Sequence, residues 1–322
     1  MEFDSIPKYE LTEKMFRQLV RIDDCISHLS SVEYGEARLI LRKTSHIHSI
    51  NSSLAIEGND LPLSKTIDII DGKAVQGPFD EIIETKNAIE AYSQIGKFDV
   101  SSIDDFLRIH DVLTFGLIEK PGFREEGVGV FDGDRLIYKA PDYTQVPSLI
   151  KELFDWCSRT NCQTVIKSAV MHFYIESIHP FVDGNGRIGR LWQNAILQEY
   201  DPVFKMVSIE STIRKKQDQY YSVLEDCQSA SSCESFIEFS NDVILSSLDG
   251  LMNIRNEKMT ALLTSMGKNA MSAEEIMEAL GVSNRSNFLK NYIRPAIESG
   301  IVVMTDPEHP RSRFQKYRKT IV

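Results

Sequence analysis

Apolar residues recur at three- and four-residue intervals along most of the chain, which is the spacing of one face of an α-helix. Few stretches show the strict alternation of a half-buried strand. The pattern therefore predicts a mostly α protein. The predicted helices cover residues 10–30, 33–57, 62–72, 81–95, 102–117, 145–159, 164–178, 185–200, 213–228 and 233–266.

One segment among these helices reads as a β-hairpin. Within residues 122–142, Val128 and Val130 alternate with glycines, the turn-forming run FDGD follows at 131–134, and RLIY at 135–138 resumes an extended pattern. The sequence predicts this as the one clear hairpin among helices.

The pattern changes after Met266. Residues 272–300 read as two helices joined by a tight turn at Gly281, and residues 301–319 read as two extended pieces around a proline-rich turn. A helix-turn-helix followed by such a pair is typical of a winged helix. We expect three parts, namely an N-terminal helical region over 1–95, a core over 96–257 and a winged-helix-like domain over 258–322.

Charge and composition narrow the class of protein. The net charge of −11 argues against wholesale binding to nucleic acid or to an anionic membrane, and 42% apolar residues can fill a sizeable core. The chain has neither an apolar signal core at its start nor an apolar run of spanning length, so we expect a soluble cytoplasmic protein without a membrane partner. Five cysteines without a CxxC pair read as free thiols.

The C-terminal end has the opposite charge. The last twelve residues carry five basic residues and no acidic ones: Arg311, Arg313, Lys316, Arg318 and Lys319. Three interpretations remain open, namely DNA binding through residues 268–322, docking of a protein, and a solvated end without a specific ligand.

The stretch HPFVDGNGRIGR, residues 179–190, gathers a base, a carboxylate, glycines and an amide in one loop between two apolar helices. Gly184 and Gly186 permit positive φ and close backbone approach, so N–H groups of the loop and of the next helix can converge on an anion. The following helix has an apolar stripe of Ile188, Leu191, Trp192, Ala195 and Ile196. This stripe leaves Arg187, Arg190 and Asn194 together on another face.

These residue types indicate phosphate chemistry. Two guanidinium groups at a helix N-terminus oppose the helix dipole but suit a polyphosphate, which arginine binds bidentately. Asp183 is well placed for Mg²⁺, and His179 is the natural general base because its pKa lies near working pH. The chain has no Walker A sequence and no kinase signature.

Every position of HPFVDGNGRIGR matches HxFx[D/E]GNGRxxR, the signature of the Fic (filamentation induced by cAMP) family, and the chain resembles that family over roughly residues 35–235. The resemblance implies a Fic-type helical bundle and a protein adenylyltransferase that uses ATP and Mg²⁺. Such enzymes move AMP from ATP to a Ser, Thr or Tyr hydroxyl of a target protein. The related Doc-type kinases carry Lys where this chain has Gly186, so glycine favours AMP transfer over phosphoryl transfer.

The resemblance also implies roles for single residues. His179 would deprotonate the target hydroxyl, Phe181 would anchor the loop, and Asp183 would bind Mg²⁺. The α-phosphate would lie against Asn185 and the backbone of Gly184 and Gly186. The β- and γ-phosphates would lie against Arg187 and Arg190.

Two further segments resemble parts of the family. The hairpin at 122–142 resembles the flap, which would pair with the backbone of the target protein beside the acceptor residue. The segment YYSVLEDCQ resembles a YYxxL segment near the adenosine, so Tyr220, Tyr221 and Gln228 are expected at the nucleotide. The tyrosine pair can equally be core packing.

The sequence SSLAIEGN resembles the family's inhibitory motif [S/T]xxxE[G/N], with Ser53 and Glu57 on one helix face and Gly58 as the stop. A carboxylate in the last turn of a helix opposes the helix dipole unless a cation answers it. The resemblance names Arg190 as that cation, so Glu57 would withhold it from the γ-phosphate.

Other interpretations remain beside the autoinhibited, possibly self-modifying enzyme. The chain could be a DNA-binding regulator whose Fic-like core only senses a nucleotide, or an enzyme that removes AMP at the same site. The spacing of His172 and Glu176 would suit two ligands of a metal site, but we expect both residues to pack the helix. His46 and His48 lie on different helix faces and read the same way.

Overall fold

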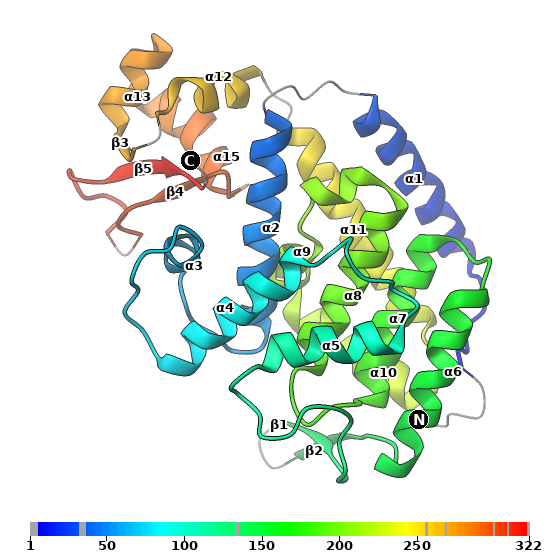
Figure 1. The fold of residues 1–322 in the computed structure, drawn as a ribbon. Helices are drawn as coiled ribbons and strands as arrows, with labels where there is room; N and C mark the ends of the chain where they lie inside the picture. Colours follow the sequence, from blue (N-terminus) through cyan, green and yellow to red (C-terminus); the bar gives the residue numbers. More distant parts are fainter. Residues whose placement is uncertain are drawn as a thin grey trace.

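The computed structural model describes residues 6–31, 37–132, 135–254, 257–267, 269–298, 300–307 and 309–320. The predicted fold class is confirmed, since the described chain is mostly helical (Figure 1). The α-helices are α1 (Glu13–Ser30), α2 (Ala37–Ile56), α3 (Leu63–Ile70), α4 (Phe79–Ser93), α5 (Ile103–Thr114), α6 (Val146–Arg159), α7 (Thr164–Ile178), α8 (Asn185–Tyr200), α9 (Ile209–Lys215), α10 (Gln217–Ala230), α11 (Glu234–Ile254), α12 (Glu257–Ser265), α13 (Ala273–Leu280), α14 (Arg285–Phe288) and α15 (Arg294–Glu298). The short helical turns are η1 (Tyr143–Gln145), η2 (Pro202–Met206) and the π-helical η3 (Leu289–Ile293).

The helices α7 and α8 form the centre of the fold (Figure 1). Nearly every residue of α7 is buried, as expected for a helix that is apolar on all sides. Its neighbours α6 and α11 pack against it, and α5 packs against α8. The loop with the predicted chemistry joins α7 to α8, so two buried helices hold its ends.

Both faces of α8 are buried. The predicted apolar stripe enters the core, where Trp192 Nε1 donates a hydrogen bond to Val100 O at 2.9 Å. The opposite face, with Arg187, Arg190 and Asn194, is also buried and faces α2 and α4. Because charges avoid burial unless they are paired, this second face needs partners from the N-terminal helices.

The N-terminal helices lie on two sides of the core. Helix α1 runs along α11, and polar contacts fix it there: Thr12 Oγ1 donates to Glu238 Oε1 at 2.6 Å and Gln18 Nε2 donates to Asp242 Oδ1 at 2.7 Å. Helix α2 runs between the core and the C-terminal region (Figure 1). The predicted helix 33–57 is α2, although residues 33–36 lie outside the described residues.

The predicted hairpin is present as strands β1 (Gly129–Asp132) and β2 (Arg135–Lys139), which pair antiparallel. The predicted turn FDGD includes residues 133–134, which lie outside the described residues. At the base of the hairpin, the buried Tyr138 donates from its hydroxyl to Ser177 O at 2.9 Å. The hairpin is therefore bound to the end of α7, beside the predicted catalytic loop.

The C-terminal region folds as the helix-turn-helix and wing pattern predicts. A capping box of Ser272 and Glu275 starts α13, and Gly281 ends it with φ of +69°. Helices α14 and α15 and the turn η3 form one continuous second helix. The sheet has three strands in the order β3 (Met271–Ser272), β5 (Lys316–Lys319) and β4 (Val302–Met304), so β3 adds to the two predicted extended pieces.

This region packs on the N-terminal helices. His48 Nε2 donates to Gly300 O at 2.9 Å, and Arg318 Nη1 pairs with Asp68 Oδ1 at 3.2 Å. Lys319 Nζ donates to Leu263 O at 3.3 Å. Two of the five basic residues of the tail therefore bind this chain itself rather than facing solvent.

One predicted helix is wrong in its continuity. The predicted helix 213–228 is broken at Lys216 into α9 and α10. A periodic pattern cannot locate such a break, because both pieces remain amphipathic. The predicted helix 233–266 corresponds to α11 and α12, and residues 255–256 between them lie outside the described residues. Helix α12 packs against α13 and η3.

Two expectations concern the chain as a whole. The five cysteines are unpaired. Among the described residues, no helix combines the length and the apolar character needed to cross a bilayer.

Candidate active site

Helix α7 ends at His179, which has the left-handed conformation φ 51° and ψ 58°. A non-glycine residue reaches this region only when its surroundings hold it there. Two backbone contacts do so: His179 N donates to Ile175 O at 3.0 Å, and His179 O accepts from Arg124 Nε at 2.8 Å. The chain therefore turns sharply at the predicted base.

The ring of His179 has one assigned hydrogen bond, from Nδ1 to Glu176 O at 3.3 Å. A backbone carbonyl only accepts, so Nδ1 carries the proton and Nε2 of the neutral ring has a free lone pair. In its neutral form, the half-buried ring thus offers Nε2 as a proton acceptor, which is what a general base needs.

The loop turns at Asp183 and Gly184. Gly184 has φ of +84°, and its N–H donates to Asp183 Oδ1 at 2.6 Å. The side chain of Asp183 is 57% exposed, so a ligand can reach it. Burial raises the pKa of Asp183, but the nearby Arg187 guanidinium outweighs that effect and holds the pKa below its usual range. This carboxylate is therefore ionised at neutral pH.

Asn185 and Phe181 lock the loop from inside. Asn185 Oδ1 accepts from Phe181 N and Asn185 Nδ2 donates to Phe181 O, both at 3.0 Å. The Phe181 ring is fully buried and stacks on His110 with ring centroids 3.4 Å apart. Phe181 anchors the loop as expected. The side chain of Asn185 has a structural task here, and its contact with an α-phosphate stays a prediction.

Arg187 lies in the first turn of α8, where the first backbone N–H groups have no acceptor within the helix. Its Nη1 donates to Glu84 Oε1 at 2.6 Å, and its Nη2 donates to Asp183 Oδ2 at 2.7 Å. Its Nε is buried and has no hydrogen-bond partner among the described residues.

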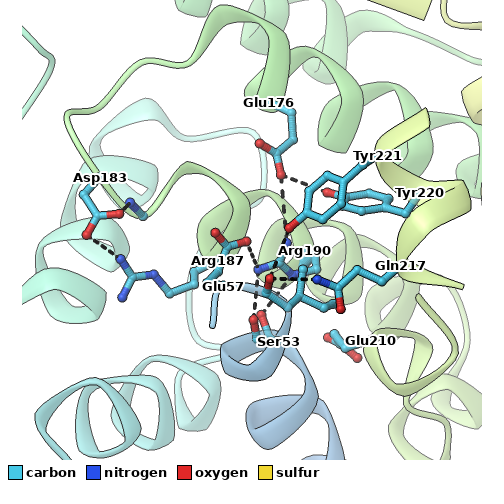
Figure 2. A network of polar contacts seen from close by, with 12 residues as sticks. Ser53, Glu57, Glu176, Asp183, Arg187, Arg190, Glu210, Gln217, Tyr220 and Tyr221 are labelled. Carbon is cyan, nitrogen blue, oxygen red and sulfur yellow. Dashed lines mark hydrogen bonds and ion pairs between the residues drawn. The ribbon is translucent and has the colours of Figure 1, made fainter. Parts of the chain in front are cut away.

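Arg190, one turn further, is bound by the end of α2 (Figure 2). Its Nη2 donates to Glu57 Oε1 at 2.7 Å and to Ser53 O at 3.0 Å, and its Nε donates to Ser53 Oγ at 3.1 Å. Burial lowers the pKa of this fully buried guanidinium, but Glu57, Tyr220 and Glu176 together raise it above its usual value, so Arg190 stays charged. The predicted contact between Glu57 and Arg190 is thus present.

The end of α2 has the predicted form. Gly58 has φ of +89°, and Asn59 N donates to Leu54 O at 3.2 Å, which closes the last turn. The last helical carbonyl, Ile56 O, accepts from Tyr221 OH at 3.1 Å and from Gln217 Nε2 at 3.2 Å. Helix α10 therefore holds the turn that carries Glu57.

Gly186 is needed for a reason other than positive φ. It lies inside α8, and the prediction of positive φ holds only for Gly184. A β-carbon on Gly186 would overlap Glu57 Oε1 and would lie 2.9 Å from Arg190 Nη1. Only glycine leaves room for the carboxylate against the helix.

The two tyrosines differ in burial. Tyr220 is fully buried and its hydroxyl bonds Glu176 Oε1 at 2.9 Å and His172 Nε2 at 3.0 Å. Tyr221 is 45% exposed. Gln228 is buried and donates to Ser177 Oγ at 3.4 Å. Direct contact of these three with adenosine stays a prediction, and Tyr220 has a structural task in the core.

His172 is a packed histidine. Its Nδ1 bonds Gln193 Oε1 at 2.7 Å, and its ring packs edge-on against Phe236. Its Nε2 lies 3.8 Å from Glu176, the carboxylate that also lies 4.0 Å from Arg190. The pair predicted to pack the helix thus belongs to the polar network around Arg190.

A buried carboxylate, Glu210, ties the helices of the site together. It accepts from Ser49 Oγ at 2.6 Å, from Asn194 Nδ2 at 2.6 Å and from Tyr92 OH at 3.1 Å. These partners come from α2, α8 and α4. Satisfied buried networks of this kind fix one arrangement of the elements that they join.

Sequence reasoning missed Arg124, His110 and Glu84. Arg124 is buried and donates to carbonyls, among them Glu126 O at 2.8 Å and Pro141 O at 2.6 Å. It therefore links the hairpin to the catalytic loop. His110 donates from Nε2 to Asp183 O at 2.8 Å. The GFR sequence before the hairpin was a faint signal for Arg124, whereas no local pattern points to Glu84.

The chain is similar to known proteins over most of its length. The family model described as Fic/DOC family matches residues 100–197, and the model of the Fic-like C-terminal domain matches residues 257–320. A Fic family protein from Desulfovibrio desulfuricans G20, known from its crystal structure, is 34% identical in sequence to this chain. The two structures align over 98% of each chain with a TM-score of 0.73. The chain belongs to the Fic family.

Curated Fic relatives are named as enzymes. A probable protein adenylyltransferase from Aquifex aeolicus is 27% identical over 63% of this chain and 64% of its own length. The protein adenylyltransferase fic-1 from Caenorhabditis elegans is 26% identical over 78% of this chain and 51% of its own length. This Fic chain therefore spans between half and two thirds of the length of these relatives.

Proposed function

We propose that this Fic family chain is a protein adenylyltransferase that moves AMP from ATP to a Ser, Thr or Tyr hydroxyl of a target protein, and that Glu57 restrains it by holding Arg190. Family relatives named protein adenylyltransferase support the activity. The ion pair of 2.7 Å between Glu57 and the fully buried Arg190 is the observation that carries the restraint.

Unsatisfied donors at the start of α8 support a polyphosphate ligand. Arg187 Nε and Arg190 Nη1 are buried without a hydrogen-bond partner among the described residues. Buried donors of charged groups are costly unless an acceptor binds them. Phosphate oxygens, together with the free N–H groups and the positive end of the helix dipole, would supply those acceptors.

The residues of this chain would divide the reaction among them. His179 Nε2 takes the proton of the target hydroxyl, whose oxygen attacks the α-phosphorus of ATP as pyrophosphate leaves. Arg187 and Arg190 hold the β- and γ-phosphates in line, and Tyr221 and Gln228 lie toward the adenosine. Glu57 blocks this arrangement because its carboxylate occupies the Nη2 of Arg190.

Asp183 would hold Mg²⁺. Among the described residues, no three His, Cys, Asp or Glu side chains form a metal cluster. Mg²⁺ often uses one or two carboxylates and completes its shell with water and substrate phosphates, and the exposed, ionised Asp183 fits that demand. When bound, the ion neutralises charge on the phosphates.

The hairpin is proposed to receive the target protein. Strands β1 and β2 pair only with each other among the described strands, so each leaves a free edge that an extended target segment can join. Arg124 fixes the hairpin to His179 O, so the added segment would lie beside the proposed base.

The test uses ATP labelled at the α-phosphate and, in parallel, at the γ-phosphate, with Mg²⁺ and a cell lysate. We expect covalent α-label on protein with Glu57→Gly, less with the native chain and none with Glu57→Gly/His179→Ala. Covalent γ-label would show phosphoryl transfer and contradict the proposal. Reversible ATP binding without covalent label would leave the nucleotide-sensing regulator as the better account.

The same variants and labelled proteins distinguish AMP removal from AMP transfer. If the native chain removes α-label from proteins that Glu57→Gly has modified, and Glu57→Gly does not, AMP removal is its principal activity. Salt-dependent binding of duplex DNA would add a role for residues 268–322, and a flat salt slope would argue against phosphate contacts there.

A further inference from the structure

Glu84 connects the turn that carries Glu57 to the first arginine of the motif. Its Oε1 accepts from Arg187 Nη1 at 2.6 Å, and its Oε2 accepts from Asn59 Nδ2 at 2.9 Å. Asn59 stands two residues after Glu57 in the same turn. One end of this turn therefore reaches Arg190 directly, and the other reaches Arg187 through a single carboxylate.

The two residues that Glu84 connects, Arg187 and Asn59, are buried and held by hydrogen bonds. Arg187 is 4% exposed and Asn59 is 5% exposed, so water competes little for their hydrogen bonds. Asn59 is itself held, because its Nδ2 also donates to Glu81 O at 3.1 Å and its Oδ1 accepts from Leu61 N at 3.1 Å. A shift of the turn therefore changes the position of Glu84.

The two arginines use different edges of the guanidinium group. At Arg190, the edge formed by Nε and Nη2 is taken by Ser53 and Glu57. At Arg187, Glu84 takes Nη1 and leaves the edge of Nε and Nη2 to Asp183 alone, with Nε unpartnered. This edge, like the edge of Nη1 and Nη2, carries two parallel N–H groups that can bind phosphate oxygens bidentately.

We infer that Glu84 is a positioning residue for ATP binding. It orients the guanidinium of Arg187 toward the phosphates, and through Asn59 it couples that orientation to the turn that carries Glu57. The inference rests on the proposed function for the role of Arg187. Glu84 is not a second inhibitor in this proposal, since it bonds neither Nε nor Nη2 of Arg187.

The first test measures ATP and AMP affinity by calorimetry with Mg²⁺ in the Glu57→Gly background. Adding Glu84→Ala should weaken ATP binding about tenfold or more, because Arg187 loses its charged partner, and should change AMP binding less than about twofold, because AMP lacks the β- and γ-phosphates. Glu84→Gln, which keeps the shape, should fall between. Glu90→Ala is the matched control, because Glu90 is exposed on the same helix and its carboxylate accepts from Gln94 Nε2.

The second test measures coupling. Asn59→Ala and Glu57→Gly should act on ATP affinity non-additively in a double-mutant cycle, and additivity within about twofold would overturn the coupling. Any of three results would overturn the positioning role. These are unchanged ATP affinity in Glu84→Ala, an equal loss of ATP and AMP binding, and a rise in self-modification when Glu84→Ala is made alone. The affinity measurements of both tests need no AMP transfer, so a protein that binds ATP as described but transfers nothing would contradict only the proposed function.

Discussion

Glu57 Oε1 occupies the space that a β-carbon on residue 186 would need, so Gly186 admits the carboxylate that binds Arg190. This relationship joins the two motifs at one point of contact. It also means that the residue expected to distinguish AMP transfer from phosphoryl transfer is the residue on which the proposed restraint depends.

Gly186→Ala should therefore separate Glu57 from Arg190. The added methyl group would displace the Glu57 carboxylate, and it would also narrow the proposed site of the α-phosphate. We expect the variant to lose the ion pair and to bind ATP at least about tenfold more weakly than Glu57→Gly, which removes the pair without filling the space. Calorimetry on both variants checks this, and equal ATP affinities would contradict it.

Glu57→Gly should raise self-modification and lower stability at the same time. A restraint that is closed 99% of the time corresponds to about 2.7 kcal/mol, so release can raise the rate about a hundredfold. Arg190 is left buried without its carboxylate, which should cost about 1 to 3 kcal/mol of unfolding free energy. Urea unfolding measures the loss, and added ATP should restore stability in the variant more than in the native chain. If the variant shows neither change, Glu57 does not restrain the enzyme.

Arg124→Ala should uncouple the hairpin from the catalytic loop. The guanidinium donates to carbonyls of both parts, and none of its bonds touches the proposed phosphate site. We expect modification of the target protein to fall at least about tenfold in the Glu57→Gly background, while ATP affinity stays within about threefold. Arg159→Ala, an exposed arginine on α6, is the control for a change of charge. Parallel loss of ATP binding would show that Arg124 supports the whole site instead.

His110 should make stability depend on pH. Burial lowers the pKa of this histidine from 6.5 to about 4, and its Nδ1 has no hydrogen-bond partner among the described residues. Between pH 6.5 and pH 4 the unfolded chain binds a proton here that the folded protein does not bind. The free energy of unfolding is therefore fully retained above pH 6.5 and falls as the pH drops toward 4, by about 3 kcal/mol in total.

His110→Gln tests this dependence. The amide nitrogen of Gln can still donate to Asp183 O, but the side chain does not titrate. Urea unfolding at pH 7, 6, 5 and 4 should give a smaller loss of stability for the variant than for the native chain. Parallel curves would show that His110 does not titrate in this window.

The sequence predicted those features that depend on neighbours along the chain. The capping box at Ser272 and Glu275 and the positive φ at Gly58 and Gly184 follow from residue types at fixed spacing. The motif from His179 to Arg190 was readable because it is continuous, and its resemblance to a family named Glu57 as the partner of Arg190. The break at Lys216 was not readable, because helical periodicity continues through it.

The sequence by itself determined the helical class, the turns that end the helices and the chemical groups gathered in one loop, since local sterics and periodicity suffice for these. Only the tertiary structure decided which distant side chains complete the site. Glu84 meets Arg187 across 103 residues, and Arg124 meets His179 across 55. Such contacts have no period along the chain. They arise because α2, α4 and the hairpin pack on α7 and α8, where a buried charge or carbonyl requires whichever partner the packing supplies.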